Sequence, residues 1–547
     1  MCYTGGQYWQ KGVFLMYDLL IRSTQILDGT GAPAFPGTIA VKDGRLFILP
    51  ADAAAEAVTV LDAQGKYTCP GFIDPHSHGD AVLGTDFGSL SKISQGITTH
   101  VGGMCGFSMF PVNPETLPLL QESLGLLTHS FPPEMETFSA AENYFRWTDT
   151  VKRPENLMVM VGHIALRAAV MGYDNREPTE AELAQMQSLL RDAMEHGAAG
   201  LSSGLVYVPS AYARAEELTA LCRVVAEFDG VYTTHMRNEA GDSLETVRES
   251  IAVARNSGVR LHISHHKLQG RANWGMSRQT LQLIHEARAE GIRVTCDQYP
   301  YTASQTHLSV CAPPKYYSNG LSGMLAYLQD PATRAQIKAE MNDPATPYDN
   351  FYLHAGGWEG VLISDAPYSP EAQGKTVAQL AAERDQDPFD TFCDILIANR
   401  GVATAIYFTM SEEDVFAIIR DEAVMVGTDG IVKSMTDKSH PRAYGTFPRA
   451  IRYFVKEHHL MPLEAMIRKM TGFPAETMGL KHKGLIRDGY DADLVILDYD
   501  AVSDKADYLH PNEPADGIDC VIVAGQVVYR DKTLTGAAPG KTIRYGR

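Results

Sequence analysis

Apolar and polar residues follow a regular rhythm through the middle of the chain. Between residues 179 and 297, amphipathic stretches with helical spacing alternate with short apolar runs that are typical of buried strands. Three of these runs end at His235, His265 and Asp297, which lie 30 and 32 residues apart. The pattern therefore predicts a series of βα units with parallel strands.

Two architectures fit such a series. In a closed (β/α)8 barrel, the carboxyl ends of the strands meet at one face, where active sites lie. A doubly wound open sheet is the alternative, but no glycine-rich phosphate-binding turn follows an early strand of this chain. We therefore expect an α/β protein built on a (β/α)8 barrel.

The two ends of the chain have a different pattern. Residues 16–66 and 484–530 alternate between apolar and polar positions and contain several turn sequences, which is typical of β hairpins. We expect one small β domain formed by residues 1–70 and 481–547, beside a barrel of residues 71–480. Two unrelated β appendages are the alternative. Because Met16 begins the first periodic stretch, we also expect residues 1–15 to be dispensable for folding.

Residues 300–400 fit the barrel rhythm poorly. They contain Pro313-Pro314, several aromatic residues and a helical stretch near residues 325–341. We expect a lid-like insertion over one barrel loop. Its apolar side chains either form a wall at the barrel mouth or pack the insertion's own core, and they include Tyr316, Tyr317, Leu321, Met324 and Tyr327.

Composition and charge exclude several functional classes. The chain has 547 residues, of which 45% are hydrophobic and 21% charged, as in globular proteins. Its net charge of −19 argues against binding to nucleic acid or to an anionic membrane surface. No apolar run is long enough to span a membrane, and the amino terminus lacks a secretory signal. The eight cysteines are scattered, which is typical of reduced thiols in a cytoplasmic protein. The oligomeric state stays open.

Several candidate metal ligands follow apolar runs. His76 and His78 are two residues apart, so in a strand they point to the same side and can share one ion. Cys105 lies among glycines, and a thiolate is a strong zinc ligand. His235 and His265 end neighbouring predicted strands. The residues alone thus give the candidate ligands His76, His78, Cys105, His235 and His265, with Asp429, in Gly427-Thr428-Asp429-Gly430, as candidate catalytic base.

Short segments in order along nearly the whole chain carry a family resemblance. They are PGFIDPHSH at 70–78, GMCGFSMFPV at 103–112, GLSSGLVYVPS at 200–210, THMRNE at 234–239, ISHHK at 263–267, DQYPYTAS at 297–304, GTDG at 427–430, HPRAYGTFPR at 440–449 and GLIRDGYDADLVILD at 484–498. This set resembles the D-aminoacylase (N-acyl-D-amino-acid deacylase) family of the amidohydrolase superfamily.

The resemblance implies a fold, a reaction and roles for particular residues. The fold is a (β/α)8 barrel with a small β domain from both termini, and the reaction is zinc-dependent hydrolysis of N-acyl-D-amino acids to a carboxylate and a free D-amino acid. Cys105, His235 and His265 would hold one Zn²⁺ tightly. His76 and His78 would form a second, weaker metal position, and Asp429 would be the catalytic aspartate. Tyr207 and Lys267 would bind the substrate's α-carboxylate, with Tyr299 or Tyr301 as a third group.

The sequence departs from the family pattern in ways that bear on specificity. Met104 stands where the family usually has asparagine. Members selective for acidic substrates carry an arginine after the YPYTA segment, and residues 308–312 contain none. We therefore expect neutral, hydrophobic substrates. The D configuration is implied by the resemblance alone.

Two other functional classes are weighed against this one. A cyclic-amide hydrolase of the hydantoinase or dihydroorotase type would usually carry a carbamylated lysine at the end of the fourth strand, and residues 198–203 contain no lysine. A non-catalytic scaffold with an amidohydrolase fold would be expected to lack metal ligands, whereas all the candidates are present. Both classes are therefore less favoured than the deacylase.

Overall fold

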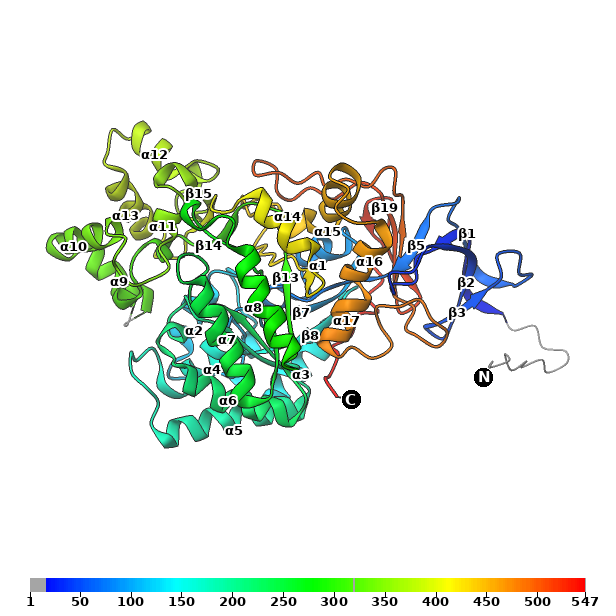
Figure 1. The fold of residues 1–547 in the computed structure, drawn as a ribbon, viewed down its shortest axis with the longest axis horizontal. Coiled ribbons are helices and arrows are strands. Elements are labelled where there is room, and N and C mark those ends of the chain that lie inside the picture. Colours follow the sequence, from blue (N-terminus) through cyan, green and yellow to red (C-terminus); the bar gives the residue numbers. More distant parts are fainter. Residues whose placement is uncertain (1–15, 318–319, 547) are drawn as a thin grey trace.

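Parallel strands form a closed barrel in the computed structural model, which describes residues 16–317 and 320–546 (Figure 1). One parallel sheet contains β6, β7 and β8, and another contains β9 to β13 and β17. The two sheets are joined at one side because only Met160 separates β8 from β9, and at the other side by a bridge between Ser77, after β6, and Gly430, after β17. This closure confirms the barrel and excludes the open doubly wound sheet. In barrel order the strands are β6 (Phe72–Asp74), β7 (Ile97–Gly102), β8 (Asn156–Val159) with β9 (Val161–Gly162), β10 (Gly200–Gly204), β11 (Val231–His235), β12 (Arg260–Ile263), β13 (Val294–Gln298) and β17 (Val424–Val426).

Helices surround the barrel, and α5 begins and ends at the sequence signals expected of it. In α5, the Thr179 side chain accepts the Glu182 backbone N–H and Glu182 bonds back, which forms a capping box. Gly197 ends the helix with φ 108°, a conformation that glycine tolerates best. The helices between the barrel strands include α1 (Asp86–Ile93), α4 (His163–Met171), α5 (Glu180–His196), α6 (Ala215–Glu227), α7 (Ser243–Ser257), α8 (Ser277–Ala289) and α14 (Glu412–Arg420).

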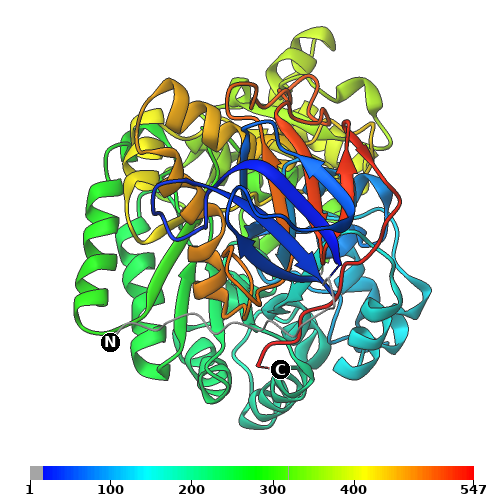
Figure 2. The ribbon, with the colours of Figure 1, turned by 90° about the vertical axis from the view of Figure 1, so that its right-hand side faces the viewer.

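Strands from both chain ends form one sheet, as the sequence predicts. Strand β18 (Leu494–Leu497) pairs antiparallel with β5 (Tyr67–Pro70), which joins the two halves. Figure 2 shows the amino-terminal and carboxyl-terminal strands side by side on this face of the molecule. The domain boundaries at residues 70 and 481 stay a prediction. The other strands of the sheet are β1 (Tyr17–Ile26), β2 (Phe35–Lys42), β3 (Arg45–Leu49), β4 (Ala57–Asp62), β19 (Ile518–Val523), β20 (Gln526–Arg530) and β21 (Thr533–Leu534).

The segment between β13 and α14 forms a separate unit at the far end of the molecule from the β domain (Figure 1). Tyr316 and Met324 pack into its own core, Leu321 lines a cavity beside the barrel, and Tyr317 does both. The apolar residues of the insertion thus serve both purposes considered above. Its strands are β14 (Ser304–His307), β15 (Val361–Asp365) and β16 (Thr404–Tyr407), with helices α9 (Gly320–Gln329), α10 (Pro331–Asn342), α11 (Phe351–His354), α12 (Val377–Glu383) and α13 (Pro388–Ala398).

The carboxyl-terminal tail crosses the end of the barrel opposite the strand carboxyl ends. The backbone N–H of Ile543 donates to Leu157 at 2.7 Å, and that of Tyr545 donates to Gly197 at 2.9 Å. Leu157 and Gly197 lie near the amino-terminal ends of β8 and β10. The tail therefore covers the end of the barrel that is opposite the site. The expectation for residues 1–15 lies outside the described residues. Among the residues that the structure describes, no helix is long and apolar enough to cross a membrane.

Candidate metal centre and active site

Six predicted site residues meet at the carboxyl ends of the barrel strands. Their metal-binding atoms form two groups, and within each group these atoms lie within 4.8 Å of one another. Cys105 belongs to both groups, so its thiol is placed to bridge two positions. One group is His76, His78, Cys105 and Asp429, and the other is Cys105, His235 and His265.

Three of these residues adopt a backbone conformation that is uncommon for anything but glycine. The φ angles of Cys105, His265 and Asp429 are 52°, 36° and 48°. Such left-handed residues are sparse and concentrate at functional sites, where the surrounding structure holds them. Around Cys105 the chain also needs glycine, because a Cβ at Gly103 would lie 2.2 Å from the Met160 carbonyl oxygen. The glycines thus let the loop pack closely, and the thiol itself is buried.

The His76 ring contacts a carboxylate behind the cluster with one nitrogen and faces the cluster with the other. Its Nδ1 lies 3.1 Å from Oδ1 of Asp297, and its Nε2 lies 3.2 Å from the Cys105 sulfur and 3.3 Å from Oδ1 of Asp429. Burial opposes protonation of this ring, but the charges of Asp297, Cys105 and Asp429 outweigh burial and raise the pKa of His76 well above its ordinary value. A carboxylate behind one ring nitrogen is the arrangement that orients histidine ligands of metals.

Glu239 lies behind the second group. Both of its carboxylate oxygens accept hydrogen bonds of 2.7 Å from Nζ of Lys267. One of them, Oε1, also lies 3.1 Å from Nδ1 of His265. Nε2 of His265 points the other way, 3.5 Å from the Cys105 sulfur. Gln269 donates to Glu239 at 3.1 Å. This buried carboxylate therefore positions one candidate ligand and one candidate substrate-binding lysine together.

The donor set fits a zinc ion. Neither ring nitrogen of the buried His235 has a hydrogen-bond partner among the described residues, and such orphaned buried groups are rare in proteins. Burial lowers the pKa of His235 well below its ordinary value, which keeps the ring neutral and able to coordinate. Burial also raises the pKa of the Cys105 thiol, and a bound metal would favour the thiolate. Thiolate with imidazole is the ligand chemistry that zinc prefers.

Asp429 is held as a carboxylate beside the cluster. Its Oδ1 lies 3.1 Å from Nε2 of His78, and its Oδ2 lies 2.7 Å from Nη1 of Arg442. Burial alone would raise the pKa of Asp429, but Arg442 and the nearby histidines hold it well below its usual range. An ionised carboxylate at this place can accept a proton from water.

Of the predicted substrate-binding residues, three border the small cavity of about 20 Å³ at the cluster: Tyr207, Lys267 and Tyr299. Tyr207 shares a hydrogen bond of 2.9 Å with Thr306 of the insertion. Two cations lie near the Tyr299 ring. Nζ of Lys267 is 5.9 Å from the ring centre, and Cζ of Arg442 is 4.8 Å from it. Tyr301 lies outside this cavity, against Arg449 and His440.

Arg442, Glu239 and Asp297 are site residues to which the sequence analysis assigned no role. Arg442 is fully buried and reaches Asp429 from α15 (Arg442–Arg449). Each of the three lies within a segment that carries the family resemblance, and Asp297 also ends one of the three apolar runs noted above. His163 and His266, which also follow apolar runs of the sequence, lie away from the cluster. His163 contacts Ser210 and Glu217, and His266 shares a hydrogen bond with Thr280.

Comparison with known proteins points to one family. Residues 59–529 match the Amidohydrolase family. The chain is 34% identical to N-acyl-D-aspartate deacylase of Alcaligenes xylosoxydans xylosoxydans, over 97% of this chain and 95% of the relative. It is also 34% identical to D-aminoacylase of the same organism, over 96% of this chain and 97% of the relative.

A solved structure extends the likeness to three dimensions. The N-acyl-D-glutamate deacylase of Bordetella bronchiseptica, crystallised with zinc and a phosphonate inhibitor, is 34% identical to this chain. The two structures superpose with a TM-score of 0.80, over 97% of this chain and all of the other.

We predict that Glu239→Gln lowers the free energy of unfolding, because it leaves the Lys267 ammonium buried without its carboxylate. Removing one partner of a buried ion pair costs about 3–5 kcal/mol. Urea denaturation of the wild type and the variant measures this change. Glu245→Gln is the control, since Glu245 pairs with Arg248 on the exposed surface of α7, and such pairs contribute at most about 1 kcal/mol. Equal losses in both variants would contradict the assigned role of Glu239.

Proposed function

Because the chain belongs to the amidohydrolase family, we propose that it is a zinc-dependent hydrolase that cleaves the amide bond of N-acyl-D-amino acids. The products are a carboxylate and a free D-amino acid. The observation that carries the proposal is the Cys105-centred cluster with the ionised Asp429 beside it. The substrate class and the D configuration come from the three similar deacylases, which act on N-acyl-D-amino acids by their names.

We assign the metal positions as follows. Cys105, His235 and His265 hold the tightly bound zinc ion, and His76 and His78 form a second, weaker position next to it. When bound, zinc supplies Lewis acidity and lowers the pKa of a bound water to about 7. The absence of a lysine from β10 supports this thiolate-centred site over a carbamylated-lysine site of the cyclic-amide hydrolases.

Asp429 moves the proton in this mechanism. Its carboxylate accepts a proton from the attacking water and delivers it to the nitrogen of the departing amine, so that no net proton is gained or lost by the enzyme. Arg442 keeps the carboxylate ionised before the reaction and fixes its orientation. Asp429 thus acts first as base and then as acid.

Lys267, Tyr299 and Arg442 are the groups that bind the substrate's α-carboxylate. Lys267 and Arg442 both lie near the Tyr299 ring, 5.9 Å and 4.8 Å from its centre, so the three groups together form this part of the site. Tyr207 is placed on the other side of the cluster, where its ring centre lies 5.2 Å from that of His235. The resemblance implies that Tyr207 binds the α-carboxylate, but we propose that it orients the amide, because it lies beside the predicted zinc ligand His235.

Neutral substrates are the preferred ones in this proposal. The lining of the cluster cavity includes the apolar residues Phe107, Leu126, Ile431 and Phe351. Lys267, which lines this cavity, and Arg442, which contacts Asp429 beside it, already face the carboxylates of Glu239 and Asp429. A second substrate carboxylate would be buried without a cation, which costs several kcal/mol. The 34% identity is the same for the aspartate-specific relative and for the D-aminoacylase, so overall identity does not decide the side chain.

The substrate is thus a small molecule, and we place the enzyme in the cytoplasm. The seven cysteines of the described part of the chain are free and buried, which fits a reducing compartment.

We expect zinc-loaded protein to hydrolyse N-acetyl-D-methionine and N-acetyl-D-phenylalanine with higher kcat/KM than N-acetyl-D-glutamate and N-acetyl-L-methionine. The apolar cavity favours the methionine and phenylalanine derivatives over the glutamate derivative. The family relationship favours the D-substrates over the L-substrate. Release of free amino acid measures all four rates. A preference for the glutamate derivative would refute the cavity argument, and a preference for the L-substrate would refute the assigned stereochemistry.

Cys105→Ala should lose bound zinc and activity together, because the thiol belongs to both ligand groups. Metal analysis of protein purified without chelator measures the zinc content. Cys222→Ala is the matched control, since Cys222 is equally buried but lies on α6, and it should keep its metal. Full zinc occupancy in Cys105→Ala would reject the assigned ligand set.

Asp429→Asn should keep most of the tightly bound zinc but lose turnover, because an amide cannot accept the proton. Loss of a general base typically lowers the rate by about 10²–10⁴-fold. Steady-state kinetics with parallel metal analysis separate the two effects. Asp421→Asn, at the end of α14, is the control and should react normally. Near-normal turnover of Asp429→Asn would exclude Asp429 as the base.

A further inference from the structure

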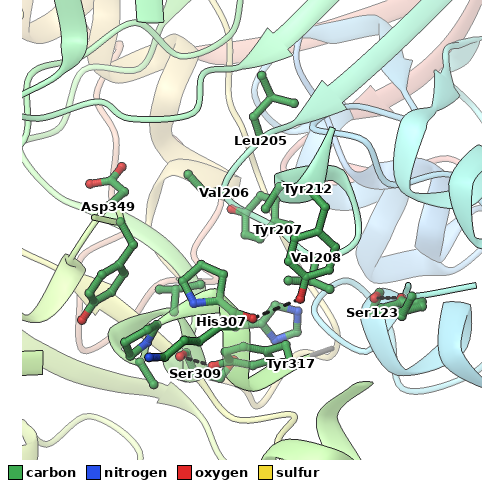
Figure 3. Close-up of a pocket in the computed structure, with 18 of the residues that line it drawn as sticks. Ser123, Leu205, Val206, Tyr207, Val208, Tyr212, His307, Ser309, Tyr317 and Asp349 are labelled. Carbon is green, nitrogen blue, oxygen red and sulfur yellow. Dashed lines mark hydrogen bonds between the residues drawn. The ribbon is translucent and has the colours of Figure 1, made fainter. Parts of the chain in front are cut away.

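A second, larger cavity adjoins the metal cluster. Its volume is about 440 Å³, which lies within the roughly 300–1,000 Å³ of typical small-molecule sites. It is formed between barrel loops and the insertion. Figure 3 shows Leu205, Val206 and Tyr207 from the loop after β10 on one side and His307, Ser309 and Tyr317 from the insertion on the other.

Two touching aromatic rings separate this cavity from the cluster. The ring centres of Phe107 and Tyr207 are 4.9 Å apart. Phe107 lies 6.4 Å from the His78 ring, and Tyr207 lies 5.2 Å from the His235 ring. Phe107, Tyr207 and Phe351 line both cavities. A chain that reaches past these rings would therefore enter the larger cavity directly from the metal ligands.

The wall of the larger cavity is mainly apolar. Its charged side chains already have partners: Arg237 pairs with Glu249, Lys315 with Glu340 and Asp349 with His354, and Glu122 accepts the backbone N–H of Leu321. Burial, aided by Lys433, lowers the pKa of His307 to about 3, so this ring is neutral at physiological pH. The apolar part of the wall includes Leu205, Val206, Val208, Val310, Ala312 and Pro313.

The cavity lies across the barrel mouth from the carboxylate-binding groups. Lys267, Tyr299 and Arg442 follow the consecutive strands β12, β13 and β17, whereas the barrel residues of the cavity wall follow β7, β9, β10 and β11. In an N-acyl amino acid the α-carboxylate and the side chain share one carbon atom, and the acyl group is attached across the scissile bond. Of these groups, the acyl chain therefore points away from the carboxylate-binding side.

We propose that this cavity binds the acyl chain of the substrate and that the enzyme prefers long, apolar acyl groups, such as octanoyl, over acetyl. This inference rests on the proposed function and adds the chemical class of the acyl group to it. An acetyl group ends near the Phe107 and Tyr207 rings and leaves the cavity unused. A longer chain transfers methylenes from water to an apolar wall, and each fully buried methylene contributes up to about a fourfold gain in affinity.

The test is a series of N-acyl-D-methionines with acetyl, butanoyl, hexanoyl and octanoyl groups. With zinc-loaded wild-type enzyme, kcat/KM should rise with chain length, by roughly 10²–10³-fold from acetyl to octanoyl. Octanoate should also inhibit more strongly than acetate. A flat or falling series, with octanoate no better an inhibitor than acetate, would overturn the acyl assignment. Failure to hydrolyse any member would instead overturn the proposed function itself.

Val206→Trp tests the location by filling the cavity. The ratio of kcat/KM for octanoyl to acetyl substrate should fall at least about tenfold, and a ratio corrects for any loss of active protein. Val58→Trp is the matched control, since Val58 is 72% exposed on the β domain, and its ratio should equal that of the wild type. If Val206→Trp changed selectivity for the amino-acid side chain and left the acyl series intact, the cavity would be the side-chain site and our assignment would be wrong.

Discussion

The metal-binding end of the barrel depends on one buried carboxylate oxygen. Oδ1 of Asp297, at the end of β13, lies 3.1 Å from Nδ1 of His76 and 2.9 Å from Nε2 of His262, and it accepts the His265 backbone N–H at 2.9 Å. It thus ties the ends of β6, β12 and β13 together and turns Nε2 of His76 toward Cys105. Gly427 makes room for this carboxylate, because a Cβ there would lie 2.5 Å from Oδ2.

Each cation of the site is paired with a carboxylate that also contacts a candidate metal ligand. Glu239 contacts Lys267 and His265, and Asp429 contacts Arg442, His76 and His78. The charges of the metal site and of the substrate-binding side are therefore coupled through these two acids. A substrate carboxylate that draws Lys267 or Arg442 toward itself changes the electrostatic surroundings of the ligands at the same time. Binding and metal chemistry share one charge network.

The sequence predicted those parts of the molecule that depend on local pattern. Strand periodicity located the barrel, and polar residues at strand ends located His235 and His265. The alternation at both termini predicted the β sheet. Pairings such as Glu239 with Lys267 and Asp429 with Arg442 could not be predicted in this way, because they join residues from different loops whose relative positions only the closed barrel fixes. For the same reason, helical spacing could not separate the core residue Met324 from Leu321 in the cavity wall, although both lie on α9.

The joining of β5 to β18 affects how the chain folds as it is made. Pro70 pairs with Leu494, so 494 − 70 = 424 residues must be added before β5 meets this neighbour. At roughly 5–20 residues per second, this takes about 20–85 s of synthesis. During that time β5 presents an open strand edge, which is a template for pairing with other chains. The edge of β5 therefore stays open on the ribosome until after all the metal-binding residues, from His76 to Asp429, have been made.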